Sequence, residues 1–141
     1  MVYLKVLQIC ARYFPQFGGV EEHVRNISER LIKKYDVVIA TTDSTGKLPP
    51  EDKLNGVPIL RFKSWAPHEA YYFSNSLNSF LARQIDNYDI LHAHGYGTFP
   101  PLSVALLKKT NNFVFTPHYH MMPHSFFRHL LHTPYKFFGT K

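Results

Sequence analysis

The sequence predicts an α/β protein with a Rossmann-like, mostly parallel sheet flanked by helices. Short runs of aliphatic and β-branched residues alternate with longer segments whose apolar residues recur at helical spacing. The short runs lack a polar face, as expected of parallel strands that are covered on both sides. With 141 residues, 45% of them hydrophobic, the chain is long enough to form one domain with its own core.

The first four segments begin this alternation. Residues 2–10 are aliphatic and β-branched over the length of one strand. The segment 20–34 carries one apolar stripe at helical spacing, which predicts an amphipathic helix. Residues 35–42 predict a second buried strand, and the polar, turn-rich residues 43–56 predict a surface loop. The stripe of the first helix consists of Val20, Val24, Ile27 and Leu31.

The remaining segments continue the pattern. Residues 57–62 predict a short strand, and Pro58 near its start favours a position at the edge of the sheet. A helix is expected over 69–85, although its serines and asparagines lower the helix propensity. The last expected elements are strands at 88–94 and 111–118 and, between them, a helix at 100–110 that begins with two prolines.

This order of elements predicts where a ligand would bind. Right-handed crossovers bring the carboxyl ends of parallel strands to one edge of the sheet, and ligands of such sheets bind outside that edge. The segments expected there are residues 11–19, the residues after Thr41, residues 92–98 and the residues from Thr116 onward.

Gly18 and Gly19 lie where the first strand leads into the first helix. The first N–H groups of a helix have no partner within it, and the helix dipole favours negative charge there. Glycine has no Cβ, so a phosphate can come close to the backbone. The dinucleotide signature G-x-G-x-x-G is absent, which argues against an NAD-binding protein. The pair therefore predicts either an anion site or a structural turn.

Two H-x-H pairs stand at the ends of predicted strands. His92 and His94 fall on one face of a regular strand, and so do His118 and His120. Imidazole is a common zinc ligand, but residues 90–141 contain no carboxylate to complete a catalytic metal site. We therefore expect no metal centre, and we keep a metal-dependent hydrolase as an alternative.

A sugar–phosphate site is a further interpretation of these histidines. Imidazole donates hydrogen bonds to hydroxyls and phosphates, and it acts as an acid or base near neutral pH. The predicted topology places Gly18, Gly19, His94 and His118 around one crevice at the carboxyl edge of the sheet.

Positive charge is concentrated in the last third of the chain. Residues 90–141 carry five Lys and Arg and no Asp or Glu, which accounts for most of the net charge of +6. Such a balance indicates anionic partners, which leaves open a phosphate, an anionic lipid surface or nucleic acid. A basic module that binds nucleic acid or other anions is thus a second alternative, although no recognition motif supports it.

The chain is expected to be one domain over residues 1–120, continued by a basic, aromatic-rich segment of the same domain over 121–141. The exposed phenylalanines expected in that segment suggest a piece of a longer protein. The N-terminus lacks the features of a signal peptide, and the single Cys10 excludes an internal disulfide framework. These features predict a cytoplasmic location.

Three stretches together resemble the N-terminal domain of GT-B glycosyltransferases of family GT4. They are "YFPQFGGVEEHVRNISERL" at 13–31, "YDILHAHG" at 88–95 and "FTPHYH" at 115–120. The resemblance implies a retaining enzyme that moves a sugar from a nucleotide-sugar donor to an acceptor. It also implies that this domain mainly holds the acceptor, while a C-terminal domain holds most of the donor.

The resemblance also implies roles for particular residues. Gly18 and Gly19 would reach the donor diphosphate or the acceptor. His118 would be the catalytic residue beside the transferring sugar, and His94 and His120 would line the acceptor side. No cofactor is implied beyond the donor itself. Many relatives use a lipid-linked acceptor, so we also expect peripheral contact with the inner face of the membrane.

Two features expected of a complete enzyme of this kind are not in the sequence. They are the family's donor domain and the E-x7-E element that the resemblance places within that domain. We therefore expect the chain alone to bind nucleotide sugars too weakly to measure and not to catalyse transfer. The candidate acceptor surfaces are the loop 43–56 and the segment 64–76, which contains Trp65, Tyr71, Tyr72 and Phe73.

Overall fold

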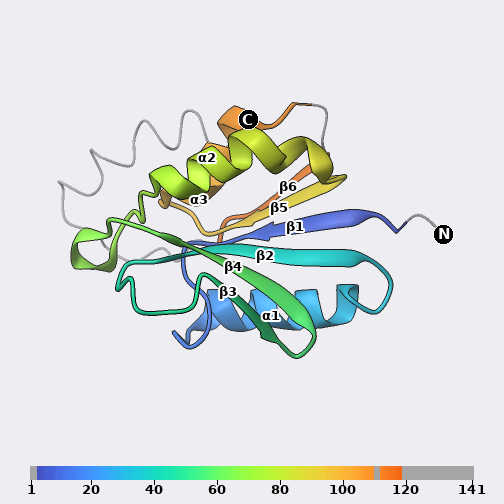
Figure 1. The fold of residues 1–141 in the computed structure, drawn as a ribbon, viewed down its shortest axis with the longest axis horizontal. Helices are drawn as coiled ribbons and strands as arrows, with labels where there is room; N and C mark the ends of the chain where they lie inside the picture. Colours follow the sequence, from blue (N-terminus) through green and yellow to red (C-terminus); the bar gives the residue numbers. More distant parts are fainter. Residues whose placement is uncertain (1–2, 110–111, 119–141) are drawn as a thin grey trace.

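A computed structural model of the chain describes residues 3–109 and 112–118. Strands and helices alternate along the chain as the sequence predicts, with two short 3-10 helices in addition (Figure 1). The elements are β1 (Lys5–Ile9), α1 (Gly19–Leu31), β2 (Asp36–Asp43), β3 (Glu51–Leu54), β4 (Val57–Lys63), η1 (Pro67–Glu69), α2 (Asn75–Gln84), η2 (Ile85–Asn87), β5 (Ile90–His94), α3 (Phe99–Leu107) and β6 (Asn112–Thr116).

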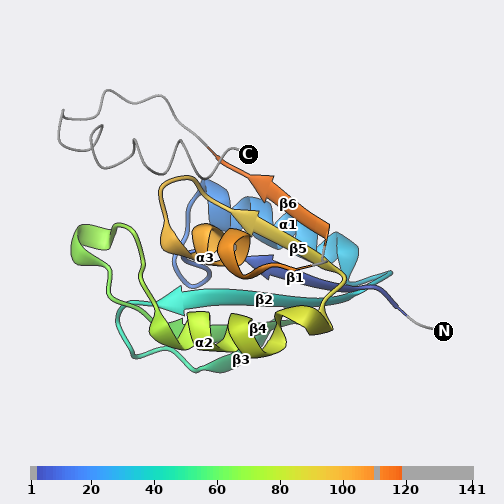
Figure 2. The same cartoon turned by 90° about the horizontal axis from the view of Figure 1, so that it is seen from above.

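The strands form a six-stranded sheet in the order β3-β4-β2-β1-β5-β6. Figure 2 shows them side by side, with β3 and β6 at the two edges. Every pairing is parallel except the one between β3 and β4. The predicted fold class, a Rossmann-like and mostly parallel sheet flanked by helices, is confirmed.

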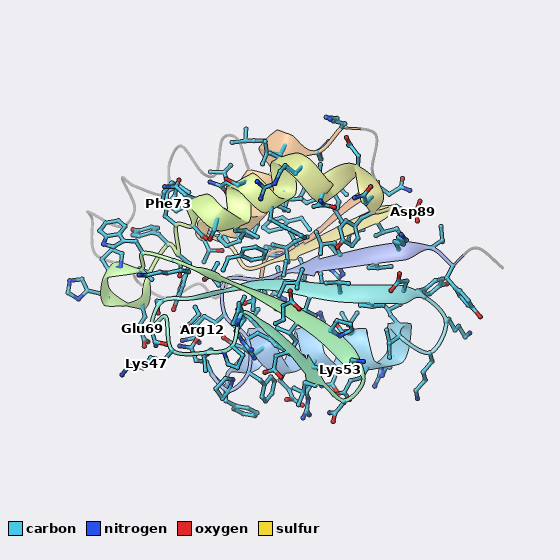
Figure 3. The ribbon with its side chains drawn as sticks, in the orientation of Figure 1. Arg12, Lys47, Lys53, Glu69, Phe73 and Asp89 are labelled. Carbon is cyan, nitrogen blue, oxygen red and sulfur yellow. The ribbon has the colours of Figure 1, made fainter. Side chains whose placement is uncertain are left out.

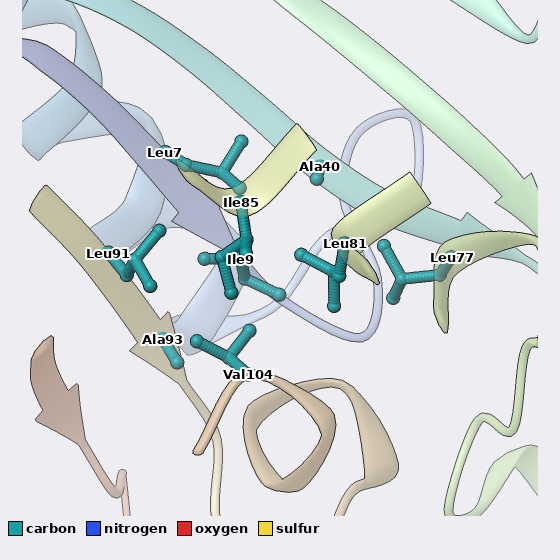
Figure 4. Close-up of a cluster of buried hydrophobic side chains, with 9 residues drawn as sticks. All are labelled: Leu7, Ile9, Ala40, Leu77, Leu81, Ile85, Leu91, Ala93 and Val104. Atoms are coloured by element: carbon teal, nitrogen blue, oxygen red, sulfur yellow. The ribbon is translucent and has the colours of Figure 1, made fainter. Parts of the chain in front are cut away.

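Helices α2 and α3 cover one face of the sheet (Figure 1). The buried residues of the core between these helices and the sheet all have hydrocarbon side chains (Figure 4). β1 and β5 contribute alternate residues to it, as the period of two requires. Burying each of its larger side chains stabilises the fold by about 1.5–3 kcal/mol. Its buried members are Leu7, Ile9, Ala40, Leu77, Leu81, Ile85, Leu91, Ala93 and Val104.

Helix α1 covers the opposite face, through the apolar stripe predicted from the sequence. Val24 is fully buried, and Val20 and Leu31 pack against the same cluster. Acidic residues lie in the first turn of α1 and a basic residue in its last turn, which suits the helix dipole. The intervening strand residues Gln8 and His94 are also buried on this side of the sheet. This face is therefore only partly apolar.

The prediction of a loop over residues 43–56 is wrong in its second half. Residues 51–54 form β3, which pairs antiparallel with β4 across the two-residue turn Asn55–Gly56. Both turn residues have positive φ, 49° and 85°, as a type I′ hairpin turn requires. An Asn-Gly pair between two strands is a strong hairpin signal, so the sequence contained the evidence for this strand.

The same hairpin corrects the expected position of the third predicted strand. β4 lies between β3 and β2, and not at the edge of the sheet. Its parallel register with β2 begins at Ile59, one residue after Pro58. The proline therefore precedes that ladder, and it is β3 that forms the edge.

The helix expected over 69–85 begins later, at Asn75. Ser74 caps it, because its hydroxyl accepts a hydrogen bond from the Leu77 N–H at 3.2 Å. Before the cap, residues 68, 69, 71 and 72 have positive φ, which is unusual for side chains with a Cβ. This left-handed stretch prevents the helix from extending toward residue 69.

The segment 121–141 lies outside the described residues, so its assignment to the same domain stays a prediction. Among the residues that the structure describes, no helix combines the length and apolar character needed to cross a bilayer.

Candidate functional site

Histidine rings from three segments gather at the carboxyl ends of the central strands. β5 contributes His92 and His94, α1 contributes His23, and His118 lies two residues after the end of β6. The ring centroids of His92 and His94 are 3.9 Å apart. Those of His23 and His118 are 4.8 Å apart, and those of His94 and His118 are 5.5 Å apart. We call these four residues the histidine cluster.

His94 is fixed in the centre of the cluster by a buried hydrogen bond to β1. Its Nε2 lies 2.6 Å from the Oε1 of Gln8, and both side chains are fully buried. An amide oxygen only accepts hydrogen bonds, so the proton of His94 is on Nε2. Its Nδ1 is then a bare acceptor, 3.3 Å from the Nε2 of His118. Gln8 thus orients His94 so that its lone pair faces His118.

His92 and His94 share one face of β5, as predicted, and both rings are uncharged. His92 Nε2 lies 2.8 Å from the hydroxyl of Thr116 on β6. Burial, with a smaller contribution from the neighbouring imidazoles, lowers the pKa of His92 to about 4 and that of His94 to about 2. Both rings are therefore neutral at pH 7. They can donate or accept hydrogen bonds, but they add no positive charge to the site.

His23 belongs to the cluster although the sequence analysis did not select it. Its ring packs edge-on against both His94 and His118. The signal was its spacing, because His23 lies three residues after Val20 and four before Ile27, two members of the apolar stripe of α1. That spacing places His23 on the helix face that meets the sheet.

The two glycines before α1 differ in what surrounds them. Gly18 has an extended backbone, with φ −173°, and a Cβ added to it would lie 2.6 Å from the Oε2 of Glu21. A Cβ on Gly19 would meet no atom within 4 Å. Neither glycine is needed for a positive φ. The missing Cβ of Gly18 leaves space for the Glu21 carboxylate. The backbone of Gly19, at the start of α1, is not covered by neighbouring atoms.

The carboxylate beside Gly18 is part of a network that fixes this loop. Glu21 is buried and accepts a hydrogen bond from the Arg12 Nε at 2.7 Å. From the other side, Arg61 Nη2 donates to the carbonyl of Phe14 at 2.8 Å. The loop is thereby held on both sides, and the charge of Glu21 at the helix N-terminus is compensated by Arg12.

The aromatic segment expected to hold the acceptor divides into buried and exposed parts. Tyr72 is buried, and Phe73 packs edge-on against Phe99 at 5.5 Å. Trp65 remains 69% exposed, and Phe17 in the glycine loop is 72% exposed. The exposed pair is therefore available to a ligand, whereas Tyr72 contributes to the fold. In Figure 3, Arg12, Glu69 and Phe73 are labelled at the end of the molecule opposite to Asp89, which precedes β5.

Asp43, at the end of β2, is used by its own loop. Its Oδ1 accepts hydrogen bonds from the Thr45 N–H and hydroxyl, and its Oδ2 accepts one from the Leu48 N–H. Burial alone would raise the pKa of Asp43, but these hydrogen bonds outweigh it and lower the pKa. The carboxylate stabilises the turn after β2, and this structural role agrees with the absence of a dinucleotide signature.

The structure thus brings His94 and His118 together at the predicted edge. Gly18 and Gly19 lie at the start of α1, the helix that contributes His23. His120 lies outside the described residues, and its role stays a prediction.

The sheet, its layers and its histidine-lined carboxyl edge define a Rossmann-like α/β domain. Residues 17–140 match the sequence model of Glycosyltransferase Family 4. The chain belongs to this family, which confirms the resemblance found in the sequence.

Two individual proteins are similar to this chain, one in sequence and one in fold. The chain is 33% identical over 102 residues to a GDP-mannose:cellobiosyl-diphosphopolyprenol alpha-mannosyltransferase of Komagataeibacter xylinus, a match that covers 68% of this chain and 25% of that protein. The sucrose-phosphate synthase of Thermosynechococcus elongatus has a similar fold, with a TM-score of 0.60 at 16% identity over 82% of this chain and 33% of that one. The chain therefore spans a quarter to a third of these relatives. Neither comparison supports a metal-dependent hydrolase or a nucleic-acid-binding module.

Proposed function

We propose that this chain forms the acceptor side of the active site of a retaining glycosyltransferase, which moves a sugar from a nucleotide-sugar donor to an acceptor. Membership of Glycosyltransferase Family 4 supports the reaction class. Residues that bind most of the donor are expected in a second domain. By itself, the chain of 141 residues is expected to bind donor weakly and to transfer no sugar.

The observation that carries the proposal is the arrangement of His94 and His118 at the carboxyl edge. His94 is neutral, buried and hydrogen-bonded to Gln8, and its Nδ1 faces the Nε2 of His118. A hydrogen bond from His118 Nε2–H to His94 Nδ1 leaves the other ring nitrogen of His118 as an acceptor. His118 can then orient a sugar hydroxyl next to the reacting carbon, and His94 holds the ring of His118 in place.

Gly19 supplies the second element of the proposed site. Its backbone borders open space at the N-terminus of α1, where the helix dipole and unpaired N–H groups favour an anion. A diphosphate group of donor or acceptor is the anion that we place there. Retaining transfer then depends on the donor phosphate and on the positioned dipoles around it, which stabilise the charge that develops in the transition state.

We further propose a diphosphate-linked lipid saccharide as the acceptor. The mannosyltransferase relative is named for such an acceptor, cellobiosyl-diphosphopolyprenol. In this chain, Phe17 and Trp65 are large, exposed side chains, and Trp and Phe are residue types with which peripheral proteins insert into the membrane interface. They are suited to peripheral contact with the membrane in which a lipid-linked acceptor resides.

The proposal is tested by kinetics on the protein translated from the complete reading frame that contains this chain. We expect His118→Ala to lower kcat by about 100- to 1000-fold, because it removes a polar contact made at the reacting sugar. The anomeric configuration of the product, measured by NMR, should match that of the donor.

Arg83→Ala is the matched control, since Arg83 is exposed on α2 and on the other side of the sheet. Its kcat should equal that of the wild type. The proposal is wrong if His118→Ala retains full kcat, and retention is wrong if the product has the inverted configuration.

A further inference from the structure

Three members of the histidine cluster have the composition of a metal site. One ring nitrogen from each of His23, His94 and His118 can be chosen so that all three atoms lie within 4.8 Å of one another. In the sequence, two histidine pairs without a carboxylate in residues 90–141 argued against a metal site. The folded chain adds a third imidazole, His23, from a helix that the sequence did not connect with these pairs.

The distances suit a tetrahedral ion. Zinc–nitrogen bonds of about 2.0–2.1 Å at tetrahedral angles place two ligand nitrogens about 3.3–3.4 Å apart. The His94 Nδ1 and the His118 Nε2 are 3.3 Å apart. Without metal, a hydrogen bond from the His118 Nε2–H to the His94 Nδ1 joins these atoms. An ion that replaces the proton needs only a side-chain movement of His23 to gain its third ligand.

Gln8 provides the outer support that metal-binding histidines require. A ligating histidine almost always donates its other ring N–H to an acceptor, which fixes its tautomer and orientation. The Nε2–H of His94 donates to the buried Oε1 of Gln8 at 2.6 Å. The Nδ1 of His94 is therefore left unprotonated on the side of His118, as a metal ligand must be.

We propose that His23, His94 and His118 form a three-imidazole binding site for a divalent transition-metal ion such as Zn²⁺. Imidazole ligands suit zinc, copper and nickel and do not suit magnesium or calcium. Three protein ligands leave a fourth position for water. An ion bound there replaces the proton on His118 Nε2 that donates to His94, so it competes with the sugar-binding arrangement proposed above and does not take part in transfer.

Calorimetric titration of the 141-residue chain with Zn²⁺, and separately with Mg²⁺, tests this proposal without any measurement of activity. We expect one Zn²⁺ per chain and no measurable Mg²⁺ binding. Gln8→Leu should weaken Zn²⁺ binding by about 10- to 100-fold, because it removes the acceptor that orients His94. His23→Ala and His118→Ala should weaken it more than that, because each removes a ligand.

Two controls separate this site from unspecific binding by other histidines. His68→Gln changes a histidine on η1, outside the cluster, and a second variant replaces the four histidines at positions 120, 124, 129 and 132 by Gln. Both should retain the wild-type affinity. The proposal is overturned if the wild type binds no Zn²⁺, if binding survives in both His23→Ala and His118→Ala, or if it is lost in either control. Circular dichroism of each variant establishes that it is folded.

Discussion

The two faces of the sheet use the same strands for different purposes. On the side of α2 and α3, β1 and β5 present hydrocarbon only, including Leu7 and Leu91 (Figure 4). On the side of α1, the alternate residues Gln8, His92 and His94 place amide and imidazole groups in the interior. Because side chains alternate along a strand, one strand can build an apolar core and a polar site at once. The comparison indicates that the first face maintains the fold and the second positions chemistry.

The polar face also contains unpaired groups that the apolar face lacks. Gln8 Nε2 and Ser28 Oγ are buried, and within the described parts of the chain they have no hydrogen-bond partner. An unpaired buried polar group costs about 1–3 kcal/mol. The α1 side is therefore less well optimised for stability, as expected where a surface serves a ligand.

The largest effect is expected on the free energy of unfolding, when one buried residue on each face of the sheet is replaced. Leu91→Ala leaves a cavity in the apolar core and should lower the free energy of unfolding by about 2–5 kcal/mol. Gln8→Leu should lower it by about 1–3 kcal/mol, because the buried N–H of His94 loses its acceptor. Urea unfolding followed by circular dichroism measures both values.

A double-mutant cycle sharpens this comparison. Gln8→Leu combined with His94→Phe removes both partners, so the pair of changes should cost less than the sum of the single changes, by about 0.5–3 kcal/mol. Simple additivity would show that the hydrogen bond between Gln8 and His94 contributes nothing, and it would remove the reason for calling this face a positioned site.

The adjacent glycines offer a smaller test, with effects of opposite sign on stability. Gly18→Ala should destabilise the chain by about 1–3 kcal/mol, since its Cβ overlaps the buried Glu21 carboxylate. Gly19→Ala should stabilise it by about 0.4–1 kcal/mol, because the Cβ meets no neighbour and the unfolded chain loses freedom. Thermal and urea unfolding of the two variants measure these shifts.

In the complete protein, Gly19→Ala should nevertheless reduce sugar transfer, since its Cβ occupies the space proposed for a diphosphate. Destabilisation by Gly19→Ala, or full transfer activity in that variant, would contradict the division of roles between the two glycines.

Much of this molecule could be predicted from the sequence because local patterns carry the information. The parallel sheet and its carboxyl edge were predicted from the aliphatic runs of β1, β2 and β5 and from the apolar stripe of α1. The edge strand β3 was missed because its residues, Glu51–Leu54, are mostly polar. The Asn55–Gly56 turn that follows it was the stronger signal and should have outweighed the polarity.

Other features depend on contacts between segments that are distant in the sequence. His23 joins the histidine cluster only when α1 packs on the sheet. The difference between Gly18 and Gly19 arises from the position of the Glu21 carboxylate, which no local pattern specifies. The neutral state of His94 likewise follows from burial against β1. The sequence could identify the candidates for the site but not their partners.

The claim that only the α1 side of the carboxyl edge receives a ligand is tested most directly by NMR. An isotope-labelled sample of the 141-residue chain is titrated with a saccharide diphosphate on a short prenyl chain and, in parallel, with a nucleotide sugar. The account predicts that the saccharide diphosphate shifts the signals of Gly19, His94 and His118 while those of Leu81 and Val104, in the apolar core, stay in place, and that the nucleotide sugar alone has little effect. Shifts confined to the side of α2 and α3, or no shift with the saccharide diphosphate at any concentration, would contradict it.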